Sequence, residues 1–397
     1  NVAVGTTALD SITTGDDNTA IGYNSLQTNT TGITNTAVGG TSLYTNLGGS
    51  YNNAFGYSAL YYNTSGTHNV AVGRLAGYNN TTASYNTSVG NSALQATTTG
   101  ASNTAVGAEA ADANTTGTFN TAVGRSAGGA ITTGSYNTAM GADTLGANVS
   151  GVNNTAVGYK ALYVNTANNN TACGYESLVA NTTGTSNVAV GNYAMTAITS
   201  GSSNVAVGMQ ALDGATTASN NVAIGNTAMS AVVTGSNNVG IGMEALLVHT
   251  SGTQNVSIGQ ASMKANTTGS NNTAVGALAL TNNTSSYNTA LGHSALEANT
   301  SASNNTAVGY QSMEANTTAI QNTAVGSLSL TLNTTGQYNT AVGYGAMDAT
   351  TTGGQNTAMG HNALGAHTTG TGNTAFGIGA SATITTGSYS TAFGYNA

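Results

Sequence analysis

The pattern of apolar and polar residues along this chain repeats every 17 residues, as in the unit Asn322–Tyr338 (NTAVGSLSLTLNTTGQY). The next copy begins at Asn339 and the previous one at Asn305. Read in this phase, 23 full units and one partial unit cover residues 1–397, and only the steps from 154 to 170 and from 272 to 288 are 16 residues long. A short period that fills a chain is typical of a solenoid, so we expect one continuous repeat array.

Several positions of the unit are restricted in residue type when its asparagine is counted as position 0. In the unit above they are Asn322 (position 0), Ala324 (2), Val325 (3), Gly326 (4) and Leu330 (8). Position 1 is Thr or Val except at Asn53, so positions 1 and 3 suit one face of an extended segment. The pattern predicts an all-β solenoid (a β-roll or β-helix) of about 24 coils, each with two short strands.

Glycine at position 4 of every unit would break a helix, and it indicates a positive φ or a close backbone approach at one corner of each coil. Asparagine at position 0 also suits a corner, because it tolerates left-handed geometry. Stacked coils would bring these amides into a hydrogen-bonded ladder. Each 16-residue unit lacks one residue in a turn, where a deletion leaves strand register intact.

The alternation of side chains also suggests what each face of the strand contacts. We expect the apolar residues at positions 3 and 8 to fill the coil interior. Position 2 is nearly always Ala and faces the other way, which favours packing against an identical chain in a homotrimer or a filament. The alternative is that position 2 is small only because the coil corner is tight.

Composition excludes several classes of protein. Charged residues make up 4% of the chain, against roughly 25% in ordinary soluble domains. Four dispersed bases cannot form a nucleic-acid interface, and no apolar run approaches the ~20 residues of a membrane span. The single cysteine, Cys173, occupies position 3 and is expected to be a small core residue. The chain begins in phase and stops within a unit, so we expect it to be a segment of a longer protein.

The residue pattern predicts no catalytic, cofactor or metal site. Serine and threonine are abundant, but none has a His and an acid placed beside it. The repeated Gly-Gly-x-Gly-x-Asp pattern of calcium-binding β-rolls is absent. The histidines lack recurring acidic partners; they are His68, His249, His293, His361 and His367.

Two sets of residues are candidates for surface contact or modification. Tyrosines at position 5 can stack on sugars or contact proteins, or they shield the rod and join neighbouring chains; they are Tyr23, Tyr57, Tyr159, Tyr175, Tyr310 and Tyr344. Asn-x-Ser/Thr sequons are possible glycosylation sites that arise from the repeat itself; they include Asn29, Asn63, Asn114, Asn181, Asn266, Asn316 and Asn333.

The tandem pattern NTAVGYxAL followed by NTTGxxNTAVG resembles the repeat regions of tail-fibre-domain proteins, and it is similar to the head repeats of trimeric autotransporter adhesins. The resemblance covers the whole chain and implies a trimeric β-solenoid exposed on a cell or virion. We therefore expect a non-enzymatic extracellular fibre, the shaft or head of an adhesin or tail-fibre-like appendage, giving rigid reach and multivalent contact. The alternatives are a module that binds cell-surface glycans or proteins through Tyr, Asn and Thr ridges, and an ice-binding solenoid based on threonine ranks.

Overall fold

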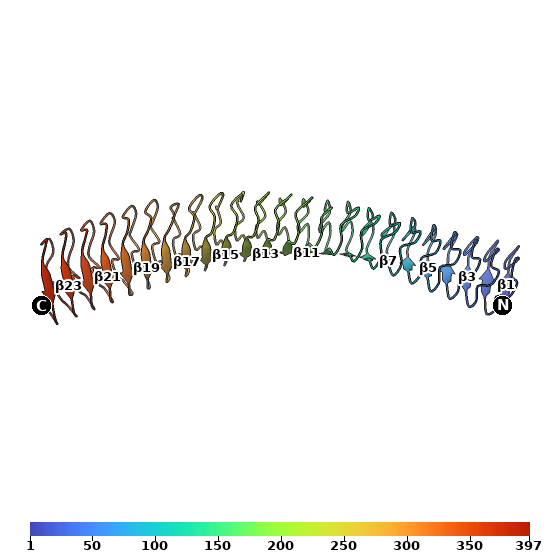
Figure 1. Ribbon diagram of the computed structural model, residues 1–397, viewed down its shortest axis with the longest axis horizontal. Coiled ribbons are helices and arrows are strands. Elements are labelled where there is room, and N and C mark those ends of the chain that lie inside the picture. The colour runs from blue at the N-terminus through green and yellow to red at the C-terminus, as the bar shows by residue number, and fades with distance from the viewer. The chain divides into compact units, whose positions relative to one another are not determined.

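The computed structural model describes residues 1–397 as an all-β chain without a helix, and therefore without a helix that could cross a membrane. The chain divides into two compact units, Asn1–Ser200 (unit 1) and Gly201–Ala397 (unit 2). Within each unit successive coils stack along the chain, and each coil contributes one short strand (Figure 1). The predicted β-solenoid with a 17-residue repeat is confirmed.

Every strand is three residues long and occupies positions 1 to 3 of its coil. Unit 1 contains β1 (Val2–Val4), β2 (Thr19–Ile21), β3 (Thr36–Val38), β4 (Asn53–Phe55), β5 (Val70–Val72), β6 (Thr87–Val89), β7 (Thr104–Val106), β8 (Thr121–Val123), β9 (Thr138–Met140), β10 (Thr155–Val157), β11 (Thr171–Cys173) and β12 (Val188–Val190). Unit 2 contains β13 (Val205–Val207), β14 (Val222–Ile224), β15 (Val239–Ile241), β16 (Val256–Ile258), β17 (Thr273–Val275), β18 (Thr289–Leu291), β19 (Thr306–Val308), β20 (Thr323–Val325), β21 (Thr340–Val342), β22 (Thr357–Met359), β23 (Thr374–Phe376) and β24 (Thr391–Phe393).

Within each unit, consecutive strands pair in parallel and equivalent residues lie side by side. The 16-residue steps do not disturb this register, since Thr155 pairs with Thr171 and Thr273 with Thr289. The tolerance predicted for these deletions is therefore confirmed. The prediction of two strands per coil was wrong: positions 5 to 16 form turns and irregular segments.

Left-handed residues explain why only one strand forms in each coil. Position 4 is glycine with φ between 124° and 142°, and a Cβ at Gly39 would lie 2.6 Å from the Gly56 oxygen. Both properties predicted for this glycine are confirmed. Positions 6, 8 and 16 also have positive φ, as at Ser58 (55°), Leu60 (51°) and His68 (58°). Contrary to expectation, the asparagine at position 0 does not adopt a left-handed backbone conformation. The residue before it, at the end of the preceding unit, does.

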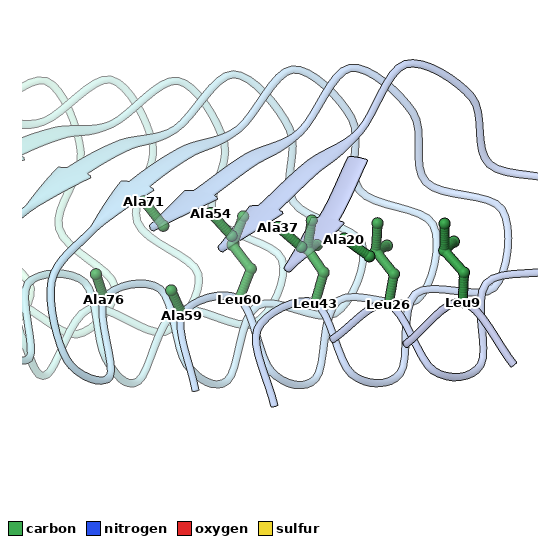
Figure 2. Packing of buried hydrophobic residues seen from close by; sticks show 10 residues of the cluster. All are labelled: Leu9, Ala20, Leu26, Ala37, Leu43, Ala54, Ala59, Leu60, Ala71 and Ala76. Carbon is green, nitrogen blue, oxygen red and sulfur yellow. The ribbon is translucent and has the colours of Figure 1, made fainter. Parts of the chain in front are cut away.

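The interior of each coil is formed by small residues of the strand facing larger ones from the opposite turn. Leucine side chains such as Leu26 and Leu43 rise towards the strand alanines, including Ala20 and Ala37 (Figure 2). All four residues are fully buried, whereas position 3 points outward. The expected orientation of the strand was therefore wrong, because alternation shows which residues share a face but not which face is inside.

The narrow interior accounts for the small residue at position 2. Where position 8 is Met229, position 2 of the next coil is Gly240, and a Cβ there would lie 2.9 Å from the Met229 Cγ. Position 2 is thus small because it meets position 8 inside the chain, not because it contacts another chain. This finding favours the alternative given above for position 2 and removes the argument for an alanine-lined chain interface.

Buried asparagines at position 0 form the predicted amide ladder. The Oδ1 atom of Asn35 accepts hydrogen bonds from the backbone N–H of Asn52 at 3.0 Å and from its Nδ2 at 3.2 Å. The Asn52 amide also donates to the carbonyl of Gly66 at 2.8 Å. Equivalent bonds recur in both units, as between Asn255 and Asn272. Each coil therefore depends on its neighbour to satisfy buried polar groups.

A second amide ladder, which the sequence analysis missed, lies at position 11. Asn63 Nδ2 donates to Asn46 Oδ1 at 2.7 Å and to the Gly66 carbonyl at 3.0 Å. Gly66 thus accepts from both ladders. The second ladder is interrupted where the next coil carries another residue. At three of these places the last amide oxygen has no hydrogen-bond partner, namely Asn80 before Thr97, Asn114 before Ile131, and Asn181 before Ile198.

The corner glycine gives a direct test of the coil geometry. Gly39→Ala should destabilise unit 1 by at least about 2 kcal/mol, because its φ of 132° is strained for an L-residue and its Cβ would clash with the Gly56 carbonyl. The matched control is Gly40→Ala, whose Cβ would meet only the Tyr57 ring at 3.5 Å. Thermal unfolding followed by circular dichroism measures both, and equal midpoints would contradict the geometry.

Candidate interaction surface

The outward side chains of positions 1 and 3 form an uncharged surface, which we call the strand face, on β1–β12 in unit 1 and on β13–β24 in unit 2. Position 1 supplies Thr or Val, with Asn53 as the one exception, and position 3 supplies only apolar residues and Cys173. Many position-3 side chains remain well exposed, as at Val207 and Val325 (37% each). Parallel pairing places each row of side chains in register along its unit.

The area of this surface is large for a soluble chain. A fully exposed aliphatic side chain presents roughly 60–120 Å² of apolar surface, from ~25 cal/mol per Å² and ~1.5–3 kcal/mol for complete burial. At about 40% exposure, the position-3 side chains of one unit present on the order of 400 Å². In each unit this row alone therefore exposes about half of the ~800 Å² that each partner buries in a standard protein interface.

The two rows vary along the chain in a way that marks particular strands. In β13–β16 both rows are Val or Ile, whereas position 1 is threonine in each strand of β17–β24. In β4 an amide and an aromatic ring, Asn53 and Phe55, share the face. Position 3 also varies in size, from valine to methionine and phenylalanine, but Asn53 is the one residue of the face with an amide group.

Cys173 lies on the strand face and is exposed, so its expected place in the core was wrong. The error follows from the reversed strand, because position 3 points outward in β11 as in its neighbours. Cys173 is a free thiol and no disulfide is present.

The six candidate tyrosines are all exposed, as the sequence predicts for variable positions. Several of their ring faces are covered by the next coil. Tyr159 lies 5.4 Å from Tyr175, Tyr310 lies 5.7 Å from His293, and Tyr344 lies 5.3 Å from His361, measured between ring centroids. Tyr23 and Tyr57 have no such ring partner. An adjacent coil thus places a ring beside four of the six candidate tyrosines.

The seven candidate glycosylation sites all fall at position 11 and are fully buried. Their amide nitrogens donate hydrogen bonds inside the coil, as when Asn29 donates to Gly32 at 3.0 Å and Asn316 to Ala319 at 3.2 Å. A glycan on such a nitrogen is incompatible with the packed coil. The recurrence of Asn at position 11 is the sequence signal that identifies these residues as buried members of the ladder. Residues that replace Asn at this position, such as Ile131 and Ile198, are buried too.

Charged side chains lie on the turns and not on the strand face. Two ion pairs join adjacent coils: Arg125 with Asp143 at 3.0 Å and Lys264 with Glu244 at 2.8 Å. Partial burial raises the pKa of the position-9 acids Asp112 and Asp348, and Glu109 adds to the effect at Asp112. No group of three or more His, Cys, Asp or Glu side chains is arranged to hold a metal ion.

Two histidines replace asparagine in the ladder at position 11. His249 is fully buried, with Nδ1 3.1 Å from the Asn266 carbonyl and Nε2 2.9 Å from the Gly252 carbonyl. His367 is also fully buried, and its Nε2 lies 3.0 Å from the Asn373 amide nitrogen. Burial lowers the pKa of both rings, and the two backbone carbonyls offset part of this effect at His249. Nothing in either environment resembles a catalytic arrangement.

Comparison with known proteins adds no further information, because no protein-family model and no curated protein matches this chain.

The buried histidines predict how stability depends on pH. Because the folded-state pKa of His249 lies below its ordinary value of about 6.5, the unfolded chain binds the proton more readily. Stability should therefore be retained above about pH 6.5 and fall as the pH drops below it, by at most ~1.4 kcal/mol per pH unit for each histidine.

His249→Asn restores the ladder residue, so urea unfolding between pH 5 and 8 should have a shallower pH dependence in this variant than in the parent. His249→Asn combined with His367→Asn should flatten it further. An unchanged dependence in both variants would show that these histidines are not its source.

Neighbouring asparagines provide a matched test of the ladder at position 11. Asn283 is buried, donates to the Ser285 carbonyl at 2.8 Å and accepts from Asn299 at 2.7 Å, whereas Asn282 is exposed. Asn283→Asp removes the donor and buries a charge, so it should cost at least about 3 kcal/mol. Asn282→Asp should cost less than ~1 kcal/mol. Urea unfolding at pH 7 compares them, and similar losses would argue against a buried ladder.

Proposed function

We propose that this chain is a non-enzymatic structural fibre whose identical copies associate through the strand face. The observation that carries the proposal is the uncharged, two-row strand face, which exposes on the order of 400 Å² from position 3 alone in each unit, an apolar patch of the size that marks interaction sites. The strand alanines are used inside the coil, so the outward valines and isoleucines are the residues left for packing between chains.

Copies of the same chain fit this surface because it carries no charge. The formal net charge of −8 comes from side chains on the turns, where they stay in water when strand faces meet. Identical parallel chains also share the same coil spacing, so the rows can match along each unit. We propose three chains around an axis, as the resemblance to tail-fibre-domain proteins and trimeric adhesin heads implies, and a location on the outside of a cell or virion.

In this role the turn surface, with its exposed tyrosines, is what the assembled fibre presents to its surroundings. Multivalent contact with glycans or proteins through that surface is a second candidate. Tyr23 and Tyr57 are its best-placed residues, because each is about 60% exposed and has no stacked neighbour. An ice-binding role is a third candidate, favoured by the unbroken run of outward threonines at position 1 of β17–β24.

Lysines on the strand face test self-association. Ile224→Lys combined with Val325→Lys places two charges on the face of unit 2, where association would bury them beside their symmetry equivalents. The parent chain should sediment as a trimer and this variant as a monomer, with at least a hundredfold weaker association. The matched control is Thr217→Lys with Thr335→Lys, two exposed turn residues of unit 2 that lie in the coil before that of Ile224 and in the coil of Val325, and it should remain trimeric.

Analytical ultracentrifugation separates the possible outcomes. A monomeric parent would overturn the fibre proposal, and a monomer that also produces thermal hysteresis would support ice binding. A parent that forms dimers would retain self-association but exclude three-fold packing. Dissociation of both lysine variants would place the interface outside the strand face.

A further inference from the structure

A periodic strand face leaves the alignment of neighbouring copies undetermined. Each coil repeats nearly the same pair of outward residues, so chains displaced by one whole coil, roughly 4.8 Å along the stack, would still place threonine and valine against threonine and valine. Only residues that break the pattern can favour one alignment over the others. The strand face contains few such residues, and most of them are apolar.

Asn53 is the one residue at position 1 that is neither Thr nor Val. It lies in β4, where its strand neighbours at the same position are Thr36 and Val70. Its side chain is partly exposed on the same face as Phe55, which is 41% exposed. The chain therefore places one amide group, with two donors and two acceptor sites, within a surface otherwise made of apolar side chains, threonine hydroxyls and the Cys173 thiol.

We propose that Asn53 fixes the register in which copies of this chain assemble, an inference that rests on the proposed function. In the aligned assembly the Asn53 amides of all copies lie at one level, and each can donate its Nδ2–H to the Oδ1 of the next. Stacked amides already pair in this way inside the coils, as Asn46 does with Asn29 at 2.8 Å. A closed set of amides satisfies donors and acceptors that would otherwise be buried without partners.

A displacement of one coil destroys this arrangement. The amide then faces the hydroxyl of the residue equivalent to Thr36 on one neighbour or the methyl groups of the residue equivalent to Val70 on another. A single buried asparagine selects register in coiled coils for the same reason, because only one alignment gives each amide a partner. At Asn53 the selection applies to stacked strands instead of helices.

The other irregular residues of the strand face discriminate less between the possible alignments of neighbouring chains. In unit 2 the all-apolar strands β13–β16 adjoin the threonine strands β17–β24, so a one-coil shift moves one threonine per copy against valine, a residue of nearly the same shape. Phe55 and Met140 differ from valine in volume, but an apolar contact replaces another apolar contact when they are displaced. Only Asn53 loses hydrogen bonds that no alternative alignment restores.

Spin-label distances report register directly. The full chain with Cys173→Val and Thr99→Cys carries one label on an exposed turn of unit 1, outside the strand face. Dipolar electron paramagnetic resonance of the assembled chain should give a single narrow distance between labels. With Asn53→Thr added, the assembly should keep its mass but give several distances, as copies displaced by whole coils accumulate. The control Thr87→Val, also at position 1, should keep the single distance.

Relocating the amide completes the test. Asn53→Thr combined with Thr104→Asn places the asparagine in β7 and should restore the single distance, which a general loss of stability at β4 cannot explain. A single distance in the Asn53→Thr assembly would overturn the register proposal while leaving self-association intact. The absence of any coupling between labels in the parent, together with a monomeric mass, would instead overturn the proposed function.

Discussion

Each coil of this protein closes within 17 residues only by placing four residues in left-handed conformations, and the rest of the structure depends on this constraint. One of the four is the position-4 glycine, and the others include side chains as large as Leu60 and His68. Left-handed backbone costs an L-residue about 1–2 kcal/mol. The few hydrogen bonds within a single coil, such as that from Asn29 to Gly32, are too few to offset such a cost four times over. Stacking supplies them, because the next coil provides the backbone hydrogen bonds, the amide partners and the apolar contacts.

The same constraint determines which residues face the inside. A coil this small encloses the Leu or Met at position 8 beside the buried residue at position 11, and the strand opposite then carries a small residue, alanine in most coils. The pair Met229 and Gly240 shows how little room remains, since a Cβ at Gly240 would lie 2.9 Å from the Met229 Cγ. The larger residues of the strand are consequently displaced outward. An exposed apolar surface is thus a by-product of tight coil closure, and it is available for assembly without altering the stability of the coil.

Sequence analysis predicted the features that follow from chain geometry alone. The period, the corner glycine and the position-0 ladder each depend on one residue type at one position. The direction of the strand could not be obtained in this way, because Ala and Val at neighbouring positions are both compatible with a buried face. The errors at Cys173 and at Asn63 share this origin: each was assigned from local sequence, a thiol or a sequon, whereas its exposure is set by the coil that surrounds it.

The two amide ladders differ in how far the sequence can vary, and hydrogen bonding explains the difference. At position 0 the Oδ1 atom accepts the backbone N–H of the next coil, as Asn18 does from Asn35 at 3.0 Å, so its loss would leave a buried main-chain donor unpaired. Position 0 is asparagine in every unit except at Ser390. At position 11 the amides bond mainly to one another and to a glycine carbonyl that position 0 also serves.

Replacing a position-11 amide can leave only a side-chain oxygen unpaired, as at Asn114 before Ile131, where Asn120 still donates to the Gly134 carbonyl at 2.8 Å. A backbone N–H remains after any substitution and still requires an acceptor. A side-chain amide that is replaced by an apolar side chain takes its own donors and acceptor with it, so no partner is required at that position. Position 11 accordingly accepts Thr, Ile, Ala and His, and position 0 does not. The position-0 ladder pairs a backbone donor of the next coil and is nearly invariant, whereas the position-11 ladder pairs mainly side-chain amides with one another and with turn carbonyls, and its residue type varies.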